Sequence, residues 1–548
     1  MPDLILGPVL RHVGTHDATV WVETDAPSEV EVLGHREGTF TVDGHHYALV
    51  FVDGLRPREV HPYEVRLDGR KVWPPPDYQF PTPSIRTLGG GGPFTVSFGS
   101  CRVALPHEPP YTLAKDEHPE GREFDALYTL AHELIRRPRE GWPDLLLMLG
   151  DQVYVDEGSP GVRERIRAGR DVSEPPGAEV RSFEEYTWLY HESWGDPTIR
   201  WLLSTVPSAM VLDDHDMADD WNISHSWKEE MNRKPWWRER VIGGLMTYWI
   251  YQHIGNLAPA ELEQHEEYQA VRRASDGAAA LREFVEWVDL NGEGKVWSFK
   301  RDLGATRLVV VDDRTGRRLD KGRRSIFDDH EWDWITDAAR GDCDHLLFAT
   351  TDPVLLPPGL HHAEAWNEAV CDGAWGDRAA ALGEKLRRAA DFDHWAAFRV
   401  SFERLERLLG ELGRGDRGRP PASIVLLSGD VHDAYLAEAE FRRDPAVESA
   451  VYQAVCSPFR NALNARERKM LGFARTRAGV ALGRVLARAV GARDPELRWR
   501  LIEGPFFDNQ VATITLEGRR ARMKLEKTVA DAQSDRRSLE TVFERPFV

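Results

Sequence analysis

The sequence of 548 residues has little cysteine, no excess of positive charge and no long apolar run. Its four cysteines, Cys101, Cys343, Cys371 and Cys456, show no C-x-x-C spacing, which argues against a zinc finger and a disulfide scaffold. The formal net charge of −20 argues against broad binding to nucleic acid or to an anionic membrane, because both reward clustered positive charge. No stretch approaches the roughly 20 apolar residues that a membrane-spanning helix needs.

The first seven residues also lack the features of an export signal. They contain no basic segment ahead of an apolar core and no pair of arginines. We therefore expect a cytoplasmic protein. At this length the chain can bury a large core, and two to four domains are expected.

Residues 1–88 are predicted to form a small β-sandwich of the immunoglobulin or fibronectin kind. Apolar and polar residues alternate in 18–24 and 29–32 with the period of half-buried strands, and further strand-like runs occupy 47–52 and 63–67. Prolines at 74–76 and 81–83 stiffen the exit, and the glycines of 89–92 predict a flexible joint. We place the domain boundary there, with a second domain over 89–548.

From Phe94 onward, apolar runs alternate with segments of helical spacing, such as 124–134, which predicts an α/β core. A helical insertion is expected at about 182–290, with long helices around 182–204 and 236–254. Residues 158–180 are interpreted as a surface loop, and the arginine-rich stretch 466–500 as a helix with a solvated outer face. A contact of that stretch with anionic lipid is the less favoured alternative. Two strand-like runs in the tail, 511–516 and 521–525, are expected to flank the core sheet.

Four apolar runs end in residues that can bind metals. Ligands of open α/β sheets lie beyond the carboxyl ends of the strands, so each ending is a candidate site. One such aspartate alone could simply cap a turn. Four endings in one chain indicate a polynuclear metal centre. The endings are Ser100-Cys101, Gly150-Asp151, Asp213-Asp214-His215-Asp216 and Gly429-Asp430-Val431-His432.

The types of these side chains favour iron. Carboxylates such as Asp151 and Asp430 suit hard cations, and one carboxylate can bridge two ions. The D-x-x-Y spacing of Asp151 and Tyr154 allows both to reach one ion, and a phenolate ligand points to Fe³⁺ because an unassisted tyrosine has a pKa of about 10. A thiolate from Cys101 adds charge-donating character, and His432 could reach the same centre as Asp430.

Together these motifs resemble the PhoD-type alkaline phosphatase family of metallophosphoesterases, over roughly residues 94–530 and in the family's order. The resemblance implies a double β-sheet core flanked by helices, within the α/β (α+β) class and preceded here by the small β-sandwich. The matching segments are Ser100-Cys101-Arg102, Gly150-Asp151-Gln152-Val153-Tyr154, Asp213-Asp214-His215-Asp216, Asp312-Asp313-Arg314 and Gly429-Asp430-Val431-His432.

The resemblance also implies a ligand set. The Fe³⁺ ligands would be Cys101, Asp151, Tyr154 and Asp430. Asp151 would bridge to Ca²⁺, helped by His432 and by a residue after the Asp-Asp-His-Asp motif. Family members often carry Asn there, whereas this chain offers three candidates, of which we take the first: Asp219, Asp220 and Asn222.

The activity expected from the resemblance is hydrolysis of phosphate monoesters or diesters through attack by a metal-bound hydroxide. The catalytic residues expected beside the ions are Asp214, His215 and Arg314. His215 either orients Asp151 or is a core histidine, and Arg314 could contact substrate phosphate with its guanidinium fork. Whether the substrate is a monoester, a diester or a phospholipid is left open.

Two rival hypotheses come from other classes of protein. In the first, Cys101 is a nucleophile and His215 or His432 is its base. In the second, the chain is a catalytically silent binding protein that works through the N-terminal sandwich. The first leaves the carboxylates at the strand ends unexplained, and the intact ligand set argues against the second.

Overall fold

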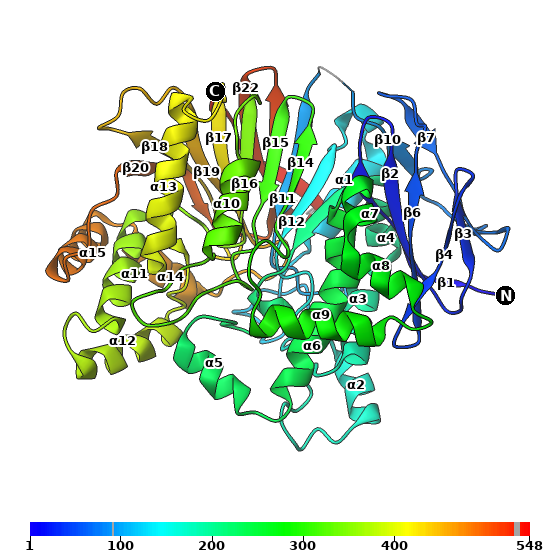
Figure 1. The fold of residues 1–548 in the computed structure, drawn as a ribbon, viewed down its shortest axis with the longest axis horizontal. Helices are drawn as coiled ribbons and strands as arrows, with labels where there is room; N and C mark the ends of the chain where they lie inside the picture. Colours follow the sequence, from blue (N-terminus) through cyan, green and yellow to red (C-terminus); the bar gives the residue numbers. More distant parts are fainter. Residues whose placement is uncertain (90–91, 531–536) are drawn as a thin grey trace.

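The computed structural model describes residues 1–89, 92–530 and 537–548 (Figure 1). The glycine joint expected at 89–92 lies partly outside the described residues. No helix in the described ranges is long and apolar enough to cross a membrane.

Strands of the N-terminal segment form antiparallel sheets. One four-stranded sheet has the order β1-β2-β6-β5 and another the order β4-β3-β8-β9, and β7 pairs with β10. Their bounds are β1 Leu4–Val13, β2 Ala18–Thr24, β3 Glu29–Val32, β4 His35–Gly38, β5 Phe40–Val42, β6 His45–Val52, β7 Val60–Pro62, β8 Val65–Leu67, β9 Arg70–Trp73 and β10 Ser84–Arg86.

The second strand, β2, is buried along its whole length, whereas the alternation of its residues predicted a half-buried strand. Val20 and Val22 lie in the core between the two N-terminal sheets. Trp21 lies between them in sequence but points into the main core, where it contacts the rings of Trp194 and Tyr251. The helices that follow in the chain therefore cover the outer face of this sheet. The boundary at residue 88 stays a prediction.

Two mixed sheets lie in the middle of the molecule (Figure 1). The first has the order β13-β12-β11-β21-β22-β23 and the second the order β14-β15-β16-β17-β19-β18-β20. The first comprises β11 Phe94–Gly99, β12 Leu145–Leu149, β13 Ser208–Val211, β21 Gln510–Glu517, β22 Arg520–Ala530 and β23 Arg537–Pro546. The second comprises β14 Phe299–Leu303, β15 Thr306–Val310, β16 His345–Ala349, β17 Ser423–Ser428, β18 Ala434–Phe441, β19 Ala450–Cys456 and β20 Leu497–Phe506.

The strands of the second sheet are apolar on both faces because each face packs on a different layer. Leu347 and Val425 share a hydrophobic cluster with the first sheet. Their neighbours Leu346 and Ile424 belong to a second cluster, formed with α10 and α13 on the other face. On the far side of the first sheet, α1 contributes Leu130 and other apolar residues. These helices are α1 Ala126–Arg136, α10 Asp329–Ala338 and α13 Arg399–Arg414.

Helices dominate residues 183–290, where a helical insertion was predicted, with β13 between α4 and α5. The helix expected over 182–204 is two helices, because Asp196 caps a new helix and Pro197 takes its first position. The bounds are α3 Phe183–Gly195, α4 Pro197–Thr205, α5 His225–Asn232, α6 Trp237–Thr247, α7 Pro259–Gln264, α8 Glu266–Arg273 and α9 Ala278–Leu290, with a π-helical turn at Tyr248–His253.

Two expectations about loops and helices were wrong. The segment 158–180 contains α2 Pro160–Gly169, which begins after Ser159, whose hydroxyl accepts from Val162 N at 3.2 Å. The arginine-rich stretch is helical only to Ala489, in α14 Ala465–Ala474 and α15 Arg477–Ala489, and β20 begins at Leu497. Both tail runs pair as expected, since β21 lies beside β11 and β22 lies beside β21.

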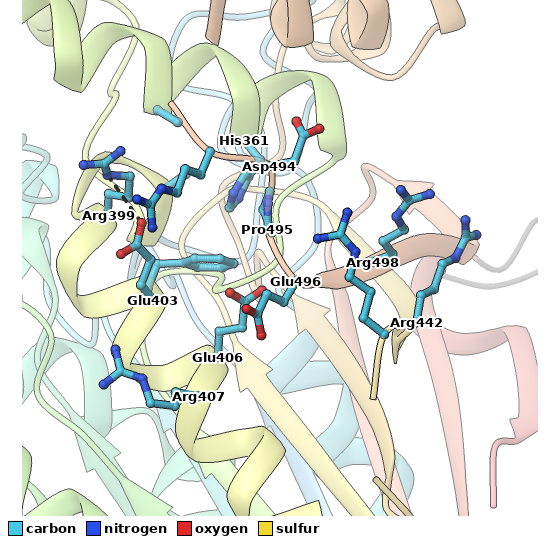
Figure 2. Close-up of a pocket in the computed structure, with 15 residues that line it drawn as sticks. His361, Arg399, Glu403, Glu406, Arg407, Arg442, Asp494, Pro495, Glu496 and Arg498 are labelled. Carbon is cyan, nitrogen blue, oxygen red and sulfur yellow. Dashed lines mark ion pairs between the residues drawn. The ribbon is translucent and has the colours of Figure 1, made fainter. Parts of the chain in front are cut away.

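The remaining helices, α11 Pro358–Cys371 and α12 Asp377–Ala389, lie together with α14 and α15 at one side of the sheets (Figure 1). Residues of α11, α13 and the segment that leads into β20 line a cavity of about 710 Å³ (Figure 2). A second cavity, of about 460 Å³, lies where the strands end.

Candidate metal centre

The strand endings that were singled out from the sequence converge at one place. In the first sheet β11, β12 and β13 are parallel, with Gly99 paired to Met148 and Leu149 to Val211, so that their carboxyl ends meet at one edge. The end of β17 reaches the same place, since Cys101 Sγ lies 3.5 Å from the carbonyl oxygen of Asp430.

Two glycines allow the strand ends to approach one another. A Cβ on Gly429 would lie 2.1 Å from Ser100 Oγ, and a Cβ on Gly150 would lie 2.4 Å from Asp213 Cβ. Glycine is therefore needed at both positions, and Gly150 also has a positive φ of 97°. The residues that follow are in the left-handed region too: φ is 53° at Asp151 and 62° at Asp430. Backbone strain of this kind accumulates at functional sites and turns side chains out of the strand direction.

Cys101 is fully buried at this edge. Its Sγ accepts a hydrogen bond of 3.1 Å from Ser457 Oγ and lies 3.0 Å from Ser100 Oγ. Burial raises the pKa of this thiol well above its usual range, and the nearby carboxylates of Asp151 and Asp430 raise it further. The thiolate form therefore requires a positive charge beside it.

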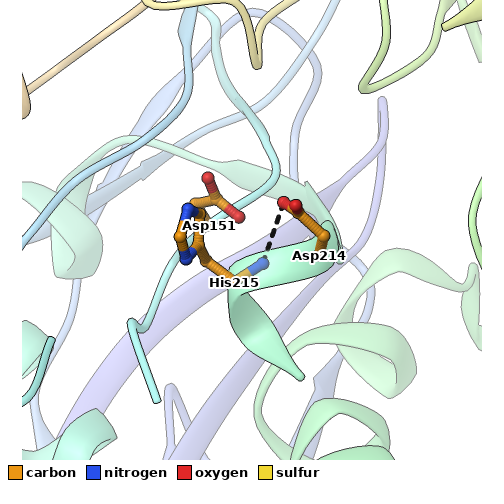
Figure 3. A group of neighbouring side chains, drawn as sticks. All are labelled: Asp151, Asp214 and His215. Atoms are coloured by element: carbon orange, nitrogen blue, oxygen red, sulfur yellow. Dashed lines mark hydrogen bonds between the residues drawn. The ribbon is translucent and has the colours of Figure 1, made fainter. Parts of the chain in front are cut away.

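Asp151, Tyr154 and His215 lie against one another. The Tyr154 hydroxyl donates a hydrogen bond of 3.0 Å to Asp151 Oδ2, and its ring stacks on His215 with 4.4 Å between centroids. Asp214 accepts from the His215 backbone N–H at 2.9 Å (Figure 3). Asp151, Asp214 and His215 each offer a ligand atom within 4.8 Å of the others. Burial, and then repulsion from neighbouring aspartates, raises the pKa of Asp151 well above its usual value.

The imidazole of His215 has a fixed orientation. Its Nδ1 lies 3.1 Å from both carboxylate oxygens of Asp156. Burial lowers the pKa of His215, but the charges of Asp156 and Asp214 outweigh it and raise the pKa well above its ordinary value. His215 is therefore held by the Asp156 carboxylate, and its role in orienting Asp151 stays a prediction.

Arg314 is the counter-ion of the cluster. Its side chain is 1% exposed, and its guanidinium forms ion pairs with Asp213 and Asp393. Its Nη2 lies 3.0 Å from Asp352 Oδ1 and 3.4 Å from Asp430 Oδ1. The hypothesis that Arg314 contacts substrate phosphate stays a prediction, and what the structure adds is that carboxylates already surround the guanidinium.

Residues that the sequence-based hypothesis did not include complete the site. His394 Nε2 lies 3.3 Å from Asp430 Oδ2, while its Nδ1 lies 2.7 Å from Glu364 Oε1. Asp352, His394 and Asp430 form a second group with ligand atoms within 4.8 Å, and Asp213, Asp214 and Asp430 form a third. The strand-like run that ends at Asp352 was a usable signal for that residue. The loop around Asp393-His394 gave none, since it has neither helical nor strand periodicity.

The candidate ligands of the second ion differ in exposure and in hydrogen bonding. Asp219 has a side chain that is 71% exposed, with Oδ1 3.7 Å from His215 Nε2. Asn222 is buried, its Nδ2 donates to the Arg314 carbonyl at 3.2 Å, and its Oδ1 has no hydrogen-bond partner among the described residues. Asp220 lines the same cavity as Asp219. His432 also lines that cavity but belongs to none of the three close groups in the described chain.

We call the cavity of about 460 Å³ the acidic cavity. The residues of the cluster that line it are Asp214, His215, Arg314, His394 and Asp430. Leu356, Leu360 and Tyr435 add an apolar wall. The arrangement can hold a small polar group against the carboxylates and a larger apolar group beside it.

The donor set fits a metal centre. Asp151 Oδ1 and Asp213 Oδ2 are buried and have no hydrogen-bond donor among the described residues. Buried carboxylate oxygens without a donor are rare in proteins, and a cation beside them satisfies them. The thiol of Cys101 and the phenol of Tyr154 lie at the same cluster, so oxygen and sulfur ligands are both available.

The two mixed sheets, the flanking helices and the acidic cluster at the strand ends define a metallophosphatase-like α/β fold, preceded by antiparallel sheets. A family model described as PhoD-like phosphatase matches residues 121–469. The match covers more than half of the chain, and the chain therefore belongs to the PhoD-like phosphatase family, as the motifs predicted. Residues 1–85 match a domain of unknown function (DUF7800).

Two solved structures resemble the chain, and the first of them agrees with this fold. A structure titled "Structure of PhoD" superposes with a TM-score of 0.58 at 13% sequence identity, covering 99% of this chain and 90% of that one. Purple acid phosphatase PPD1 from yellow lupin (Lupinus luteus) seeds gives a TM-score of 0.48 at 11% identity, covering 95% of this chain and 71% of that one. No curated protein matches the sequence.

Proposed function

We propose that the protein is a metal-dependent phosphoesterase that hydrolyses phosphate monoesters or diesters in the acidic cavity. The observation that carries the proposal is the buried carboxylate oxygens without donors, Asp151 Oδ1 and Asp213 Oδ2, at the converging strand ends. The buried acids outnumber the two buried arginines that pair with them, Arg314 and Arg317, so the site is suited to cations and to the anionic ester they attract.

We assign Fe³⁺ to Cys101, Asp151, Tyr154 and Asp430, and Ca²⁺ to a neighbouring position that Asp151 shares. The buried Oδ1 of Asn222 makes it a better candidate for the second ion than Asp219, and His432 could complete that position. When bound, such ions lower the pKa of a water ligand and neutralise charge on the phosphoryl group.

The chain's own residues would position the reacting groups. Arg314 holds the carboxylates of Asp213, Asp352 and Asp430 in fixed positions. These carboxylates are therefore already in place before substrate binds. The Asp156 carboxylate accepts a hydrogen bond from His215 Nδ1. The other ring nitrogen, Nε2, then lies 3.7 Å from Oδ1 of Asp219, which lines the acidic cavity.

A second histidine stands between two acids on the other side of the cluster. Glu364 accepts from His394 Nδ1, and Nε2 then donates to Asp430. Together with the Arg314 contact to Oδ1, this contact orients the Asp430 carboxylate. His215 and His394 both line the acidic cavity, so both would also be able to hold a proton near a leaving alcohol.

The contacts of Cys101 argue against it as a nucleophile. Sγ is fully buried between Ser100 and Ser457, and neither His215 nor His432 hydrogen-bonds to it among the described contacts. A nucleophilic thiol needs an adjacent base and a lowered pKa, whereas burial raises the pKa of this one. We therefore assign Cys101 as a metal ligand.

The test combines metal analysis with hydrolysis of a nitrophenyl phosphate monoester and a bis(nitrophenyl) diester. We expect chelation to abolish hydrolysis and Fe with Ca to restore it. Asp430→Asn should lose activity and bound metal, whereas Asp416→Asn, at an exposed aspartate paired with Arg414, should keep both. A fully metal-loaded protein that hydrolyses neither ester would refute the proposal and favour a binding protein.

A further inference from the structure

The cavity of about 710 Å³ between α11, α13 and β20 is lined by six arginines, and we call it the arginine cavity (Figure 2). The chain as a whole carries a net charge of −20, so a concentration of positive charge at one cavity is unusual for it. The arginines come from α13, from the turn after β18, from the segment that leads into β20 and from the start of β20. They are Arg399, Arg407, Arg442, Arg443, Arg493 and Arg498.

Most of these arginines have no carboxylate partner. Among the described contacts, no ion pair or hydrogen bond with the protein engages the guanidinium groups of four of them, which are exposed to solvent. Arg399 lies 3.6 Å from Glu403, and Arg442 pairs with Glu440 outside the cavity. The four are Arg407, Arg443, Arg493 and Arg498.

The acids of the same cavity are largely engaged elsewhere. Asp494 pairs with Arg488 at 2.7 Å, and Glu406 accepts from the Leu497 backbone N–H at 2.6 Å. Glu403 is the partner of Arg399. Glu406 and Glu496 have no cationic partner, so two acids face the four unpaired guanidinium groups and the cavity presents an excess of positive charge to whatever enters it.

A buried imidazole forms part of the same wall. His361 is 3% exposed and contacts the rings of Phe402 and Trp499, each with centroids 4.8 Å away. Its Nδ1 is buried and has no hydrogen-bond partner among the described residues. Buried polar atoms in native proteins are normally satisfied, so this nitrogen is a second sign that a ligand completes the cavity.

We propose that the arginine cavity binds a small anion that carries two or more phosphate groups. Guanidinium forks pair with phosphate through two parallel hydrogen bonds, and unpaired forks from three chain segments can engage more than one phosphate. The volume is within the range of small-molecule sites. A single phosphate group can contact only some of these guanidinium groups. The affinity of the cavity for the anion should therefore rise with the number of linked phosphates.

This site is separate from the acidic cavity and does not depend on the proposed phosphoesterase activity. No described residue lines both cavities. They share a wall instead: Leu360 of α11 lines the acidic cavity, and the next residue, His361, lines the arginine cavity. The test must therefore distinguish binding at one cavity from binding at the other.

The experiment is calorimetric titration of the full-length, metal-loaded protein with inorganic tripolyphosphate. The double variant Arg407→Gln with Arg498→Gln should bind at least about tenfold more weakly, with hydrolysis of nitrophenyl phosphate unchanged. A control that removes the same charge at exposed arginines elsewhere, Arg233→Gln with Arg519→Gln, should bind as the unmodified chain does. Asp430→Asn, in the acidic cavity, should retain this binding event.

Each of three titration results would overturn the proposal: equal affinity in the cavity double variant and the unmodified chain, loss of all binding in Asp430→Asn, or tighter binding of inorganic monophosphate than of tripolyphosphate. A parallel sedimentation with phosphatidylglycerol vesicles separates a free anion from a lipid headgroup. Vesicle binding that depends on Arg407 and Arg498, without tripolyphosphate binding, would also refute it. The conservative pair Arg407→Lys with Arg498→Lys keeps the charge and should retain part of the affinity, which controls for folding.

Discussion

The hydroxyl of Tyr154 donates a 3.0 Å hydrogen bond to the Oδ2 atom of Asp151, three residues earlier in the chain. The D-x-x-Y spacing predicted that one loop turns both side chains to the same point, and the positive φ of Asp151 is what turns it. Because burial raises the pKa of the Tyr154 phenol well above its usual range, a phenolate at this position requires a strong Lewis acid beside it.

We therefore expect the iron-loaded protein to be coloured by charge transfer from the Tyr154 phenolate. Tyr154→Phe should remove the visible band and lower hydrolysis by at least about tenfold, as loss of a group that holds the metal does. The measurement is the visible absorption spectrum at matched iron content. Tyr435→Phe is the matched control, because Tyr435 lines the acidic cavity but its hydroxyl donates to the Leu355 carbonyl, and its spectrum should be unchanged. A band that survives in Tyr154→Phe would exclude the phenolate ligand.

Arg314→Met should destabilise the metal-free protein strongly. The substitution leaves Asp213 buried without its cation and removes one of the two arginines that pair with Asp352 and Asp393, the other being Arg317. Removing one partner of a buried ion pair typically costs about 3–5 kcal/mol. Urea unfolding followed by circular dichroism measures the change. Arg318→Met is the control: its side chain is partly exposed and 3.3 Å from Asp328, so about 1 kcal/mol or less is expected. Equal losses in the two variants would show that Arg314 is not the counter-ion of the cluster.

The strand ends were the predictable part of the site. A buried apolar run followed by Gly and then Asp identifies both the end of a strand and the need for a close backbone approach, as Gly150 and Gly429 show. In parallel strands of one sheet the carboxyl ends share one edge, so the sequence could place Cys101, Asp151 and Asp214 together without knowing the connections. Asp430 follows β17 of the second sheet, and only the packing of the two sheets brings it to the same place.

The other half of the site depends on contacts that no local pattern encodes. Glu364 is a buried acid inside α11, and only the docking of that helix beside the loop of Asp393-His394 brings it to His394. In the same way, the residues of β2 alternate, but the strand is buried on both faces because helices far along the chain cover it. Periodicity reports one face of an element and does not report what packs on the other.

Cys101 should resist alkylation in the native protein. Its Sγ is buried, and the raised pKa of the thiol leaves little thiolate to react. We expect iodoacetamide to modify Cys371, which is partly exposed, while Cys101 stays unmodified and activity persists. Mass spectrometry of tryptic peptides together with the ester assay checks this. Rapid inactivation with carboxymethylation at Cys101 would support the nucleophile hypothesis instead.

The metal-free protein should lose stability as the pH rises from about 5 to 9. Burial, followed by repulsion from Asp391 and Asp393, raises the pKa of Asp220 to about 9, and burial also raises that of Asp216 to about 7. In the unfolded chain both groups titrate near 4, so the folded state binds more protons throughout this interval. The stability that they contribute is fully present below about pH 4 and is lost as the pH rises through the folded-state values.

Thermal unfolding at several pH values measures this dependence. Asp220→Asn removes one of the groups responsible and should flatten the decline toward pH 9, whereas Asp416→Asn, at an exposed and paired aspartate, should leave it unchanged. Saturating metal should reverse the trend, because cations favour the deprotonated carboxylates and bind more tightly as protons leave. The contrary result is an unfolding temperature of the metal-free protein that rises between pH 5 and 9. It would mean that ionised carboxylates stabilise the cluster without metal, and the argument that these acids need a cation would fail.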